Sequence, residues 1–537
     1  MRDFNFQEQT ASLLVAGAQE GRISRRRFME GALAIGMSVS AASSLWSKRV
    51  EAASPKKGGT FRVAMHEGST TDQLDPGTTE SVYMIQMNHA FRSYLTEITN
   101  TNEIGPDAAQ SWEASDDAVT WTFKLFEGME FHDGKPFTAD DAVASLNYHR
   151  GEDSKSAAKA LLEDVEDIKA DGPHTVVIKM KSGNADLPYL LSDYHLVMMP
   201  SDGEGNVDWQ SGNGTGPFKI DSHEPGVRSD LSRHPNYHKS GEPHFDAVTT
   251  IVVHEVNARQ TALITGDFDA ISDVDLKTVR LLARDQNIKV DEVPSGAHCT
   301  MPMFCDTAPF DNVDVRLALK YAIDRDEIVQ KILLGHGTKG NDHPIGPTLP
   351  YWADLPQREY DPDKAKHHLK KAGAEDLSVS LSTADFIFSG AVDMTVLFKE
   401  HAAKAGINIE VVREPNDGYW SNVWLVKPFV VVGWGARPTP DVMFSLAYKD
   451  DAAWNESHWK NADFNKILGE AKAQLNQEKR AEMYREMQLL CRDDGGTIVP
   501  FFRNRVFARR SNVMHEPEMA GNWELDGARS FQRWWFA

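Results

Sequence analysis

The sequence of 537 residues is poor in cysteine and has no excess of basic residues. Three cysteines cannot cross-link a chain of this length, so a disulfide-stabilised scaffold is excluded. The 57 lysines and arginines are outnumbered by 79 aspartates and glutamates, which gives a net charge of −22. Because binding to a phosphate backbone needs a basic surface, nucleic acid is not expected as a partner. Beyond the first fifty residues, the sequence also lacks any apolar run long enough to span a membrane.

The length and composition are those of a globular protein with more than one packed unit. At roughly 150 residues per domain, 537 residues predict two or three units. Apolar residues make up 41% of the chain and charged residues 25%, which is ordinary for folded proteins and unlike disordered ones. Strand-like and helix-like patterns alternate along the sequence, which predicts an α/β fold.

Residues 1–52 are predicted to be an export signal. An arginine run at 25–27 precedes an uncharged segment at 31–47 that is rich in glycine, alanine and serine, and Ala52 offers a small residue for cleavage. A basic start, a weakly apolar middle and a small-residue end are typical of signal peptides, and the arginine run resembles the twin-arginine signal. No cysteine precedes Cys299, so we expect a mature protein that is free in the periplasm and has no lipid anchor.

Local patterns predict two strands and the start of a helix in the first half of the chain. Apolar and polar residues alternate over 120–125 and over 175–180, as in half-buried strands. Thr138 and Asp141 have the spacing of a capping box, in which the threonine and the acid each satisfy a free backbone N–H at a helix start. A helix is therefore predicted to begin after Thr138.

Further elements are predicted in the second half. Asp361 before a proline predicts a helix start, and Gly373 predicts its end. A single longer helix is predicted over 314–334, in which the motif at 322–325 supplies core residues and a local ion pair. An apolar run at 498–502 predicts a strand.

Two segments are predicted to cross between packed units. The first is 294–309, which is rich in proline and glycine, and the second is 500–510. The first segment contains Cys299 and Cys305, which an oxidising compartment would allow to bridge, but sequence alone does not show their geometry.

Several short motifs occur in an order that is typical of one protein family. In chain order they lie at 58–64, 73–76, 106–112, 131–142, 214–218, 236–237 and 322–325. From about Gly58 to its end, the chain resembles the periplasmic solute-binding proteins of peptide, oligopeptide and nickel ABC importers, known as family 5. Many spaced motifs in the same order make this resemblance far more specific than any single motif.

The resemblance implies a two-lobed α/β fold with an extra subdomain in the first lobe and two crossing segments as a hinge. The first lobe would comprise residues 53–295 and 511–537, and the second lobe residues 296–510. The implied function is the capture of a small polar solute, a short peptide or a peptide-like molecule, between the lobes. The implied partners are this ligand and the membrane permease subunits of an ABC importer, and we expect a monomer.

The first candidate ligand-binding segment follows the predicted opening strand at 61–65. Ser69, Thr70 and Thr71 lie just beyond the carboxyl end of that strand, where α/β folds place their ligands. Their small hydroxyl side chains would allow the backbone to approach a ligand closely.

The second candidate region combines aromatic and charged residues. A buried apolar strand leads into Trp434, Arg437 and Asp441, and Trp420 precedes it. Tryptophan offers an apolar platform, and arginine binds a carboxylate through two parallel hydrogen bonds. Core packing of the two tryptophans is an equal alternative, and a helix N-cap is favoured over ligand contact for Asp441.

Arg437 departs from the pattern of the dipeptide-binding relatives. In those proteins an acid-rich stretch follows the equivalent tryptophan, and one aspartate there holds the amino terminus of the peptide. A guanidinium has the wrong charge for that role, so a ligand with a carboxylate or other anionic group is at least as well supported as a peptide held by its amino terminus.

The sequence predicts a binding protein without catalytic residues, metal or cofactor. Ser156 and Lys159 match the Ser-x-x-Lys pattern of penicillin-binding enzymes, but no Lys-Thr-Gly follows. His367 and His368 are adjacent, so a helix would point them about 100° apart and they could not bind one metal ion together. Two alternatives stay open: a carrier of nickel or another metal chelate in the same family, and a periplasmic hydrolase.

Overall fold

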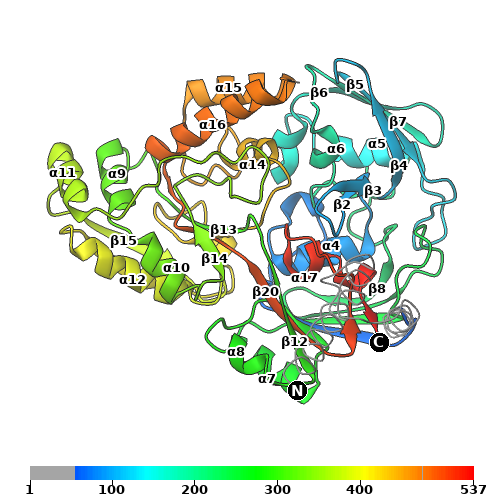
Figure 1. The fold of residues 1–537 in the computed structure, drawn as a ribbon. Helices are drawn as coiled ribbons and strands as arrows, with labels where there is room; N and C mark the ends of the chain where they lie inside the picture. Colours follow the sequence, from blue (N-terminus) through cyan, green and yellow to red (C-terminus); the bar gives the residue numbers. More distant parts are fainter. Residues whose placement is uncertain (1–54, 475) are drawn as a thin grey trace, which may run out of the picture.

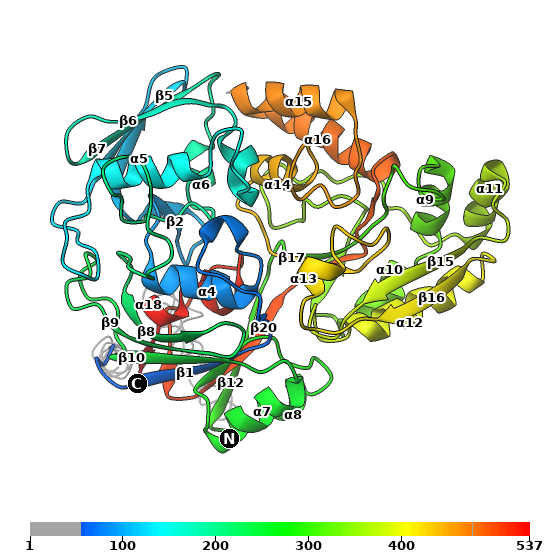
Figure 2. The same cartoon turned by 180° about the vertical axis from the view of Figure 1, so that it is seen from behind.

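The computed structural model describes residues 55–474 and 476–537, so the expected export signal at 1–52 lies outside the described residues. The described chain forms two lobes, each built on its own β-sheet with helices packed against it (Figure 1; Figure 2). An additional four-stranded sheet lies beside the first lobe. The predicted two-lobed α/β fold with an extra subdomain is confirmed. Within the described ranges, no helix combines the length and apolar character needed to cross a membrane.

The first lobe is built on a mixed sheet in the order β12-β20-β11-β1-β10-β9-β8. Its strands are β1 (Thr60–Met65), β8 (Phe218–Glu224), β9 (Arg228–Arg233), β10 (Ala247–Val252), β11 (Ala270–Ile271), β12 (Ile288–Val293) and β20 (Arg505–Arg510). The predicted opening strand is the central β1, which pairs in parallel with β10 and β11. Its apolar residues are buried on both faces, as is usual for parallel strands.

Helices and the chain end complete the first lobe. They comprise α4 (Val82–Phe91), α7 (Val256–Thr265), α8 (Val279–Leu282), α17 (Glu524–Ala528), α18 (Ser530–Arg533), β21 (Val513–Met514) and β22 (Trp535–Phe536). Phe61 of β1 packs against Phe531 and Trp534, with ring centroids 6.1 Å apart in each pair. The last residues therefore return from the second lobe to the core of the first.

The inserted subdomain is an antiparallel sheet in the order β4-β5-β7-β6, covered by α5 (Ala139–Tyr148). Its strands are β4 (Ala109–Ala114), β5 (Thr120–Leu125), β6 (Val165–Ala170) and β7 (Thr175–Met180). The same part of the chain also contains the strands β2 (Thr96–Ile98) and β3 (Ile104–Pro106), the helix α6 (Leu187–Leu190) and the 3-10 helices η1 (Pro76–Thr78) and η2 (Ala157–Leu162). The strands predicted at 120–125 and 175–180 are confirmed. The predicted capping box is also present, since the Thr138 backbone N–H donates to Asp141 at 2.9 Å.

The second lobe is built on β14-β19-β13-β17, with β18 paired to β13 (left side of Figure 1). Its strands are β13 (His298–Pro302), β14 (Gly337–Lys339), β15 (Ser378–Thr383), β16 (Asn408–Arg413), β17 (Val432–Trp434), β18 (Thr497–Ile498) and β19 (Phe501–Arg503). Its helices are α9 (Val313–Tyr321), α10 (Arg325–Lys331), α11 (Pro362–Ala372), α12 (Ala391–Ala403), α13 (Tyr419–Asn422), α14 (Pro440–Ala447), α15 (Ala462–Ala473) and α16 (Gln477–Asp493). As predicted, Asp361 caps the start of α11 and Gly373 ends it in a left-handed conformation.

The prediction of one helix over 314–334 is wrong, because α9 and α10 are separate helices. The Asp324 side chain accepts a hydrogen bond from the Glu327 backbone N–H at 2.9 Å and so caps α10. Aspartate favours this N-cap position, whereas the apolar periodicity alone had indicated a continuous helix.

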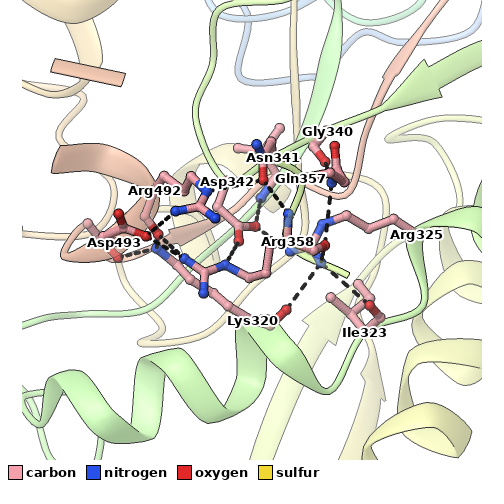
Figure 3. A network of polar contacts seen from close by, with 12 residues as sticks. Lys320, Ile323, Arg325, Gly340, Asn341, Asp342, Gln357, Arg358, Arg492 and Asp493 are labelled. Carbon is pink, nitrogen blue, oxygen red and sulfur yellow. Dashed lines mark hydrogen bonds and ion pairs between the residues drawn. The ribbon is translucent and has the colours of Figure 1, made fainter. Parts of the chain in front are cut away.

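The expected local ion pair of the motif at 322–325 is also wrong. Arg325 donates to one oxygen of Asp342 at 2.5 Å, and Arg358 donates to the other at 2.9 Å (Figure 3). All three side chains are at most 2% exposed. Although burial opposes ionisation, the positive charges of Arg325, Lys320 and Arg358 hold the pKa of Asp342 below its ordinary value. The motif therefore contributes a long-range buried charge cluster.

The structure also changes one smaller prediction and answers one question that the sequence left open. The strand expected at 498–502 is divided into β18 and β19 around Pro500, which has no N–H for a sheet hydrogen bond. In the part of the chain that the structure describes, Cys299, Cys305 and Cys491 are all free, so the bridge between the first two is not formed.

Two short connections join the lobes. Residues 294–297 connect β12 to β13, and Asn504 connects β19 to β20. Both lie within the crossing segments predicted from the sequence. Arg503 and Arg505 flank the second connection, which places two positive charges where the lobes meet.

Candidate functional site

A cavity of about 60 Å³ lies between the lobes, and we call it the aromatic cavity. Its wall contains the aromatic residues Tyr194, Trp420, Trp424, Trp434, Trp454 and Trp523 and the charged residues Glu67, Glu80, Arg437, Arg503 and Arg505. Residues from both lobes and from the segment after the inserted sheet thus share one wall. Apolar surface with a few placed charges is the usual composition of a small-molecule site.

Glu456 fixes two tryptophans of the wall, Trp424 and Trp434, by hydrogen bonds. The indole N–H groups of Trp424 and Trp434 donate to one Glu456 oxygen at 3.0 and 3.1 Å, and Thr300 donates to the other at 2.7 Å. Burial raises the pKa of Glu456 to about 7. Trp424 and Trp454 pack edge to face with centroids 5.4 Å apart. The indole rings of Trp424 and Trp434 are therefore fixed in the wall, with their polar N–H groups turned toward a protein partner.

Arg437 follows β17 and is 3% exposed. Its guanidinium carbon lies 5.1 to 5.5 Å from the ring centroids of Tyr194, Trp434 and Trp523. One terminal nitrogen donates to the Gly435 carbonyl at 3.3 Å and the other to the Tyr194 hydroxyl at 3.4 Å. Among the described residues, its Nε has no hydrogen-bond partner. Ring contacts occupy the faces of a guanidinium, so donors at its edge are left for a ligand acceptor.

The positive charge of Arg437 is only partly balanced. The nearest acid is Asp193, whose oxygen lies 3.9 Å from Nε and which also contacts the ring of His195 at 2.5 Å. Although burial opposes ionisation, His195 and Arg437 hold the pKa of Asp193 below its ordinary value. Asp193 therefore shares its charge with a second partner, and its distance from Arg437 exceeds that of a hydrogen bond.

The other two arginines of the wall are paired within the protein. Arg503 donates to Asp273 at 3.0 Å, and Arg505 donates to Glu524 at 2.8 Å. Both acids belong to the first lobe. Arg437 is therefore the arginine of this wall that has no carboxylate within hydrogen-bond distance among the described residues.

Glu67 is an acid of the wall whose charge changes near neutral pH. Its Oε1 accepts a hydrogen bond from the indole N–H of Trp420 at 2.8 Å, which joins the two lobes. Burial raises the pKa of Glu67 to about 8, although this hydrogen bond opposes the shift. At neutral pH Glu67 is therefore mostly uncharged, and it does not cancel the charge of Arg437.

The structure divides the residues predicted from the sequence into two groups. Trp420, Trp434 and Arg437 line the aromatic cavity together. Ser69 and Thr70 instead contact Asp417 of the second lobe, with hydroxyl–carboxylate distances of 3.2 Å. Thr71 forms a hydrogen bond with Ser69 at 2.8 Å and lies beside this contact. The first candidate segment thus lies where the lobes touch and outside the cavity wall.

Asp441 lies away from the cavity. It is fully buried in the first turn of α14, and its nearest cation is Lys472 at 3.9 Å. The preferred alternative of a helix N-cap is also wrong, because Thr439 holds that position and accepts from the Val442 backbone N–H. Lys472 also pairs with Asp164 of the inserted subdomain at 2.8 Å.

Several wall residues were not predicted from the sequence. Tyr194, Trp424, Trp454 and Trp523 come from segments far apart in the chain and follow no motif. The 13 tryptophans of the sequence are the only signal of an aromatic site, and they do not show which of them converge. Arg503 and Arg505 could have been identified from their place in the predicted second crossing segment.

Contacts between the lobes surround the cavity. Besides the Glu67–Trp420 hydrogen bond, Lys277 pairs with Asp393 at 2.6 Å. On the side of the inserted subdomain, Arg480 of α16 forms an ion pair with Asp186. The described structure is therefore an arrangement in which the lobes touch on both sides of the site.

A metal centre has little support in the described residues. The group with suitable spacing is Asp324, Glu327 and His401 in the second lobe. Nδ1 of His401 accepts from the Asp324 backbone N–H at 3.2 Å, Nε2 donates to Glu327 at 2.7 Å, and Glu327 also pairs with Lys331. These hydrogen bonds account for the cluster. The described wall of the aromatic cavity contains no histidine that would hold a metal chelate.

Comparison with known proteins agrees with the family resemblance expected from the sequence motifs. The model of the family "Bacterial extracellular solute-binding proteins, family 5 Middle" matches residues 103–456. The dipeptide-binding protein of Escherichia coli K12 is 25% identical over 477 residues, which cover 81% of this chain and 86% of that protein.

Two solved structures share the fold. The periplasmic binding protein AgaA of A. tumefaciens R10, in complex with agropinic acid, has a TM-score of 0.81 at 21% identity and covers 89% of this chain and 99% of its own. NikZ of Campylobacter jejuni, in complex with Ni(L-His), has a TM-score of 0.78 at 19% identity and covers 88% of this chain and 99% of its own.

Proposed function

The chain belongs to the bacterial extracellular solute-binding proteins of family 5, the substrate-binding components of ABC importers, and we propose that its ligand is a small polar solute whose carboxylate is held by Arg437. The observation that carries this proposal is that Arg437 is a buried cation on the wall of a cavity between the lobes. It is 3% exposed, and its Nε has no hydrogen-bond partner among the described residues. A buried cation with unused donors favours an acceptor of negative charge.

The electrostatics of the wall support the same ligand class. Arg503 and Arg505 are paired with first-lobe acids, and Glu67 is mostly protonated at neutral pH. Burial raises the pKa of Glu80, the other acid of the wall, to about 7, so it is only partly ionised at neutral pH and the net charge left near the ligand is positive. An ammonium group would be repelled at the position of Arg437, whereas a carboxylate would replace water at its free N–H groups.

One arginine does not account for binding on its own. A micromolar dissociation constant corresponds to about −8 kcal/mol, and a hydrogen bond to a charged group contributes about 1.5–3 kcal/mol net. The aromatic wall supplies the remaining contact area, since burying apolar ligand atoms against Trp420 and Trp434 contributes about 25 cal/mol per Å². Because Trp420 belongs to the second lobe and is bound to Glu67 of the first, ligand binding and lobe closure would support each other.

A thermal-shift screen of the mature protein tests the ligand class. The panel contains amino acids, short peptides, opines, other carboxylates and metal chelates. A ligand at 100 times its Kd stabilises the folded protein by about 2.7 kcal/mol, which gives a measurable rise in Tm. We expect carboxylates to raise the Tm of the wild type and to lose this effect in Arg437→Gln.

The control variant is Arg485→Gln, which removes an exposed arginine of α16. It should respond to the panel as the wild type does. An equal response of Arg437→Gln and the wild type would contradict the proposed role of Arg437, and a response to chelates alone would favour metal-chelate binding.

Three further proposals follow from the family and the sequence. The first lobe comprises residues 53–295 and 505–537, and the second lobe comprises residues 296–504; the boundary expected at 510 moves to 504 because β20 belongs to the first-lobe sheet. The segment 1–52 directs export, and the mature protein works in the periplasm without a lipid anchor. The protein releases its ligand chemically unchanged, which mass spectrometry of the recovered ligand would test; conversion of any bound compound would contradict this.

A further inference from the structure

A second and larger cavity lies on the other side of Arg437. Its volume is about 550 Å³, and its wall includes Asn100, Asn102, residues 294–296 of the first connection, Thr348 and Arg437. The two cavities share parts of the same segments: 435–437 contribute to both walls, and so do 521–523. Arg437 thus forms part of the partition between the two spaces.

The aromatic cavity alone is small for a solute of the size of a dipeptide. At roughly 10–15 Å³ for each water molecule, its volume of about 60 Å³ corresponds to four to six waters. Small-molecule sites usually measure about 300–1,000 Å³, and the second cavity lies within this range. A carboxylate with a few further atoms fits the first space, and the rest of a larger solute needs the second.

The second cavity has a wall suited to an uncharged, hydrogen-bonding chain. Amide and hydroxyl groups are supplied by Asn100, Asn102, Ser295 and Thr348, and peptide groups by the connection at 294–296. Two acids lie on this wall: Glu292 is already bound to Asn504 at 2.6 Å and to His336 at 3.0 Å, and Glu518 is exposed to solvent, which screens its charge. The chemistry therefore favours a neutral chain of amide or hydroxyl groups over a second charge.

We propose that the two cavities form one binding site, in which Arg437 holds the carboxylate of the solute and the second cavity holds its uncharged amide- or hydroxyl-bearing chain. This inference rests on the proposed function and extends it to the size and composition of the ligand. The wall of the second cavity includes residues of both lobes and of the first connection. A chain bound there would therefore contact the two lobes and the connection between them.

Two series of probes, each with a single carboxylate, distinguish the two sources of such a chain. The first series is the N-acetyl derivatives of glycine, diglycine, triglycine and tetraglycine, in which the carboxylate is the only charge, and the second is glycolate, glycerate and gluconate. We expect the affinity measured by calorimetry to rise at least tenfold from the shortest to the longest member of one series. The series that responds shows whether amide or hydroxyl groups are preferred.

Cavity-filling variants locate the effect. Thr348→Trp and Thr101→Trp each place a large side chain on the wall of the second cavity, one from the second lobe and one from the first, and both positions are exposed, so the fold is expected to tolerate them. Thr338→Trp is the matched control, because Thr338 is exposed on β14 outside both cavities. We expect the filled variants to lose the gain in affinity with length and to bind the shortest probe as the wild type does.

The outcomes separate this inference from the function on which it rests. Short carboxylates that bind through Arg437, without any gain from longer probes, would overturn the second cavity as a ligand compartment and leave the proposed function standing. The same gain with length in Thr348→Trp and Thr101→Trp as in Thr338→Trp would also overturn it. Absence of binding by every carboxylate in both series would contradict both proposals.

Discussion

Replacing Glu67 by glutamine is expected to remove a pH dependence from ligand binding. Glu67 is 6% exposed on the cavity wall, and Trp420 of the opposite lobe donates to it at 2.8 Å. Burial raises its pKa from an ordinary value of 4.5 to about 8. Opening the lobes would remove Trp420 and admit water, so we expect the pKa of Glu67 in the open form to lie near its ordinary value.

The direction of the effect follows from proton linkage. A carboxyl group with a higher pKa in the closed form takes up a proton on closure, so closure is favoured at low pH and is disfavoured as the pH rises from 4.5 to 8. At about 1.4 kcal/mol per pKa unit, ionised Glu67 opposes closure by about 5 kcal/mol above pH 8 and by about 3 kcal/mol at pH 7. Affinity should therefore fall about tenfold per pH unit near neutrality.

Calorimetry between pH 6.5 and 8.5, with the tightest-binding carboxylate of the panel, measures this slope. Burial raises the pKa of Asp72 to about 6 and lowers the pKa of His66 to about 4, so both titrate mainly below this range. Burial also raises the pKa values of Glu80 and Glu456 to about 7, so these two acids titrate within it. Glu67→Gln keeps an oxygen acceptor for Trp420 and should lose the part of the slope that Glu67 contributes, whereas the control Glu166→Gln, at an exposed position of β6, should keep the full slope. A flat profile in the wild type, or an unchanged slope in Glu67→Gln, would refute the reasoning.

Two other perturbations test the long-range charge pairs. Asp342→Ala leaves Arg325 and Arg358 buried without their carboxylate, so it should lower the free energy of unfolding, measured by urea denaturation, by about 3–5 kcal/mol. The control Asp116→Ala, at an exposed position, should change the free energy of unfolding by less than about 0.5 kcal/mol. Asp186 and Arg480 pair across the contact between the inserted subdomain and α16, and the side chain of Arg480 is 2% exposed. Because Asp186→Ala leaves Arg480 without its partner when the lobes touch, we expect it to weaken ligand binding about 100-fold or more, measured by calorimetry. An unchanged Kd in Asp186→Ala would show that this contact does not contribute to closure.

Sequence patterns predicted those elements whose signals are local. The capping box of Thr138 and Asp141, the alternation over 120–125 and the stop at Gly373 each depend on residues a few positions apart. The order of spaced motifs then indicated the two-lobed fold, which the structure and the family match confirm. The division of 314–334 into two helices was missed because apolar periodicity continues through Asp324, whose capping role becomes visible only with the backbone in place.

Long-range relationships account for what the sequence did not predict. Arg325 and Asp342 both lie in the second lobe, but nothing in the sequence between them, which forms α10 and β14, indicates that they meet. Trp434 and Arg437 were predicted from one strand and the loop after it, whereas Tyr194 and Trp523 join them only through the packing of distant segments. The unused donor of Arg437 is likewise a property of the assembled wall, because it depends on Asp193 being 3.9 Å away.

The most direct test of the account is a crystal structure of the mature protein with the tightest-binding carboxylate of the panel. The account predicts a carboxylate oxygen within roughly 3 Å of Nε or a terminal nitrogen of Arg437. It also predicts ligand atoms against Trp420 and Trp434. A ligand bound between the lobes with its carboxylate on other residues, and with Arg437 still facing only Gly435 and Tyr194, would contradict the central claim.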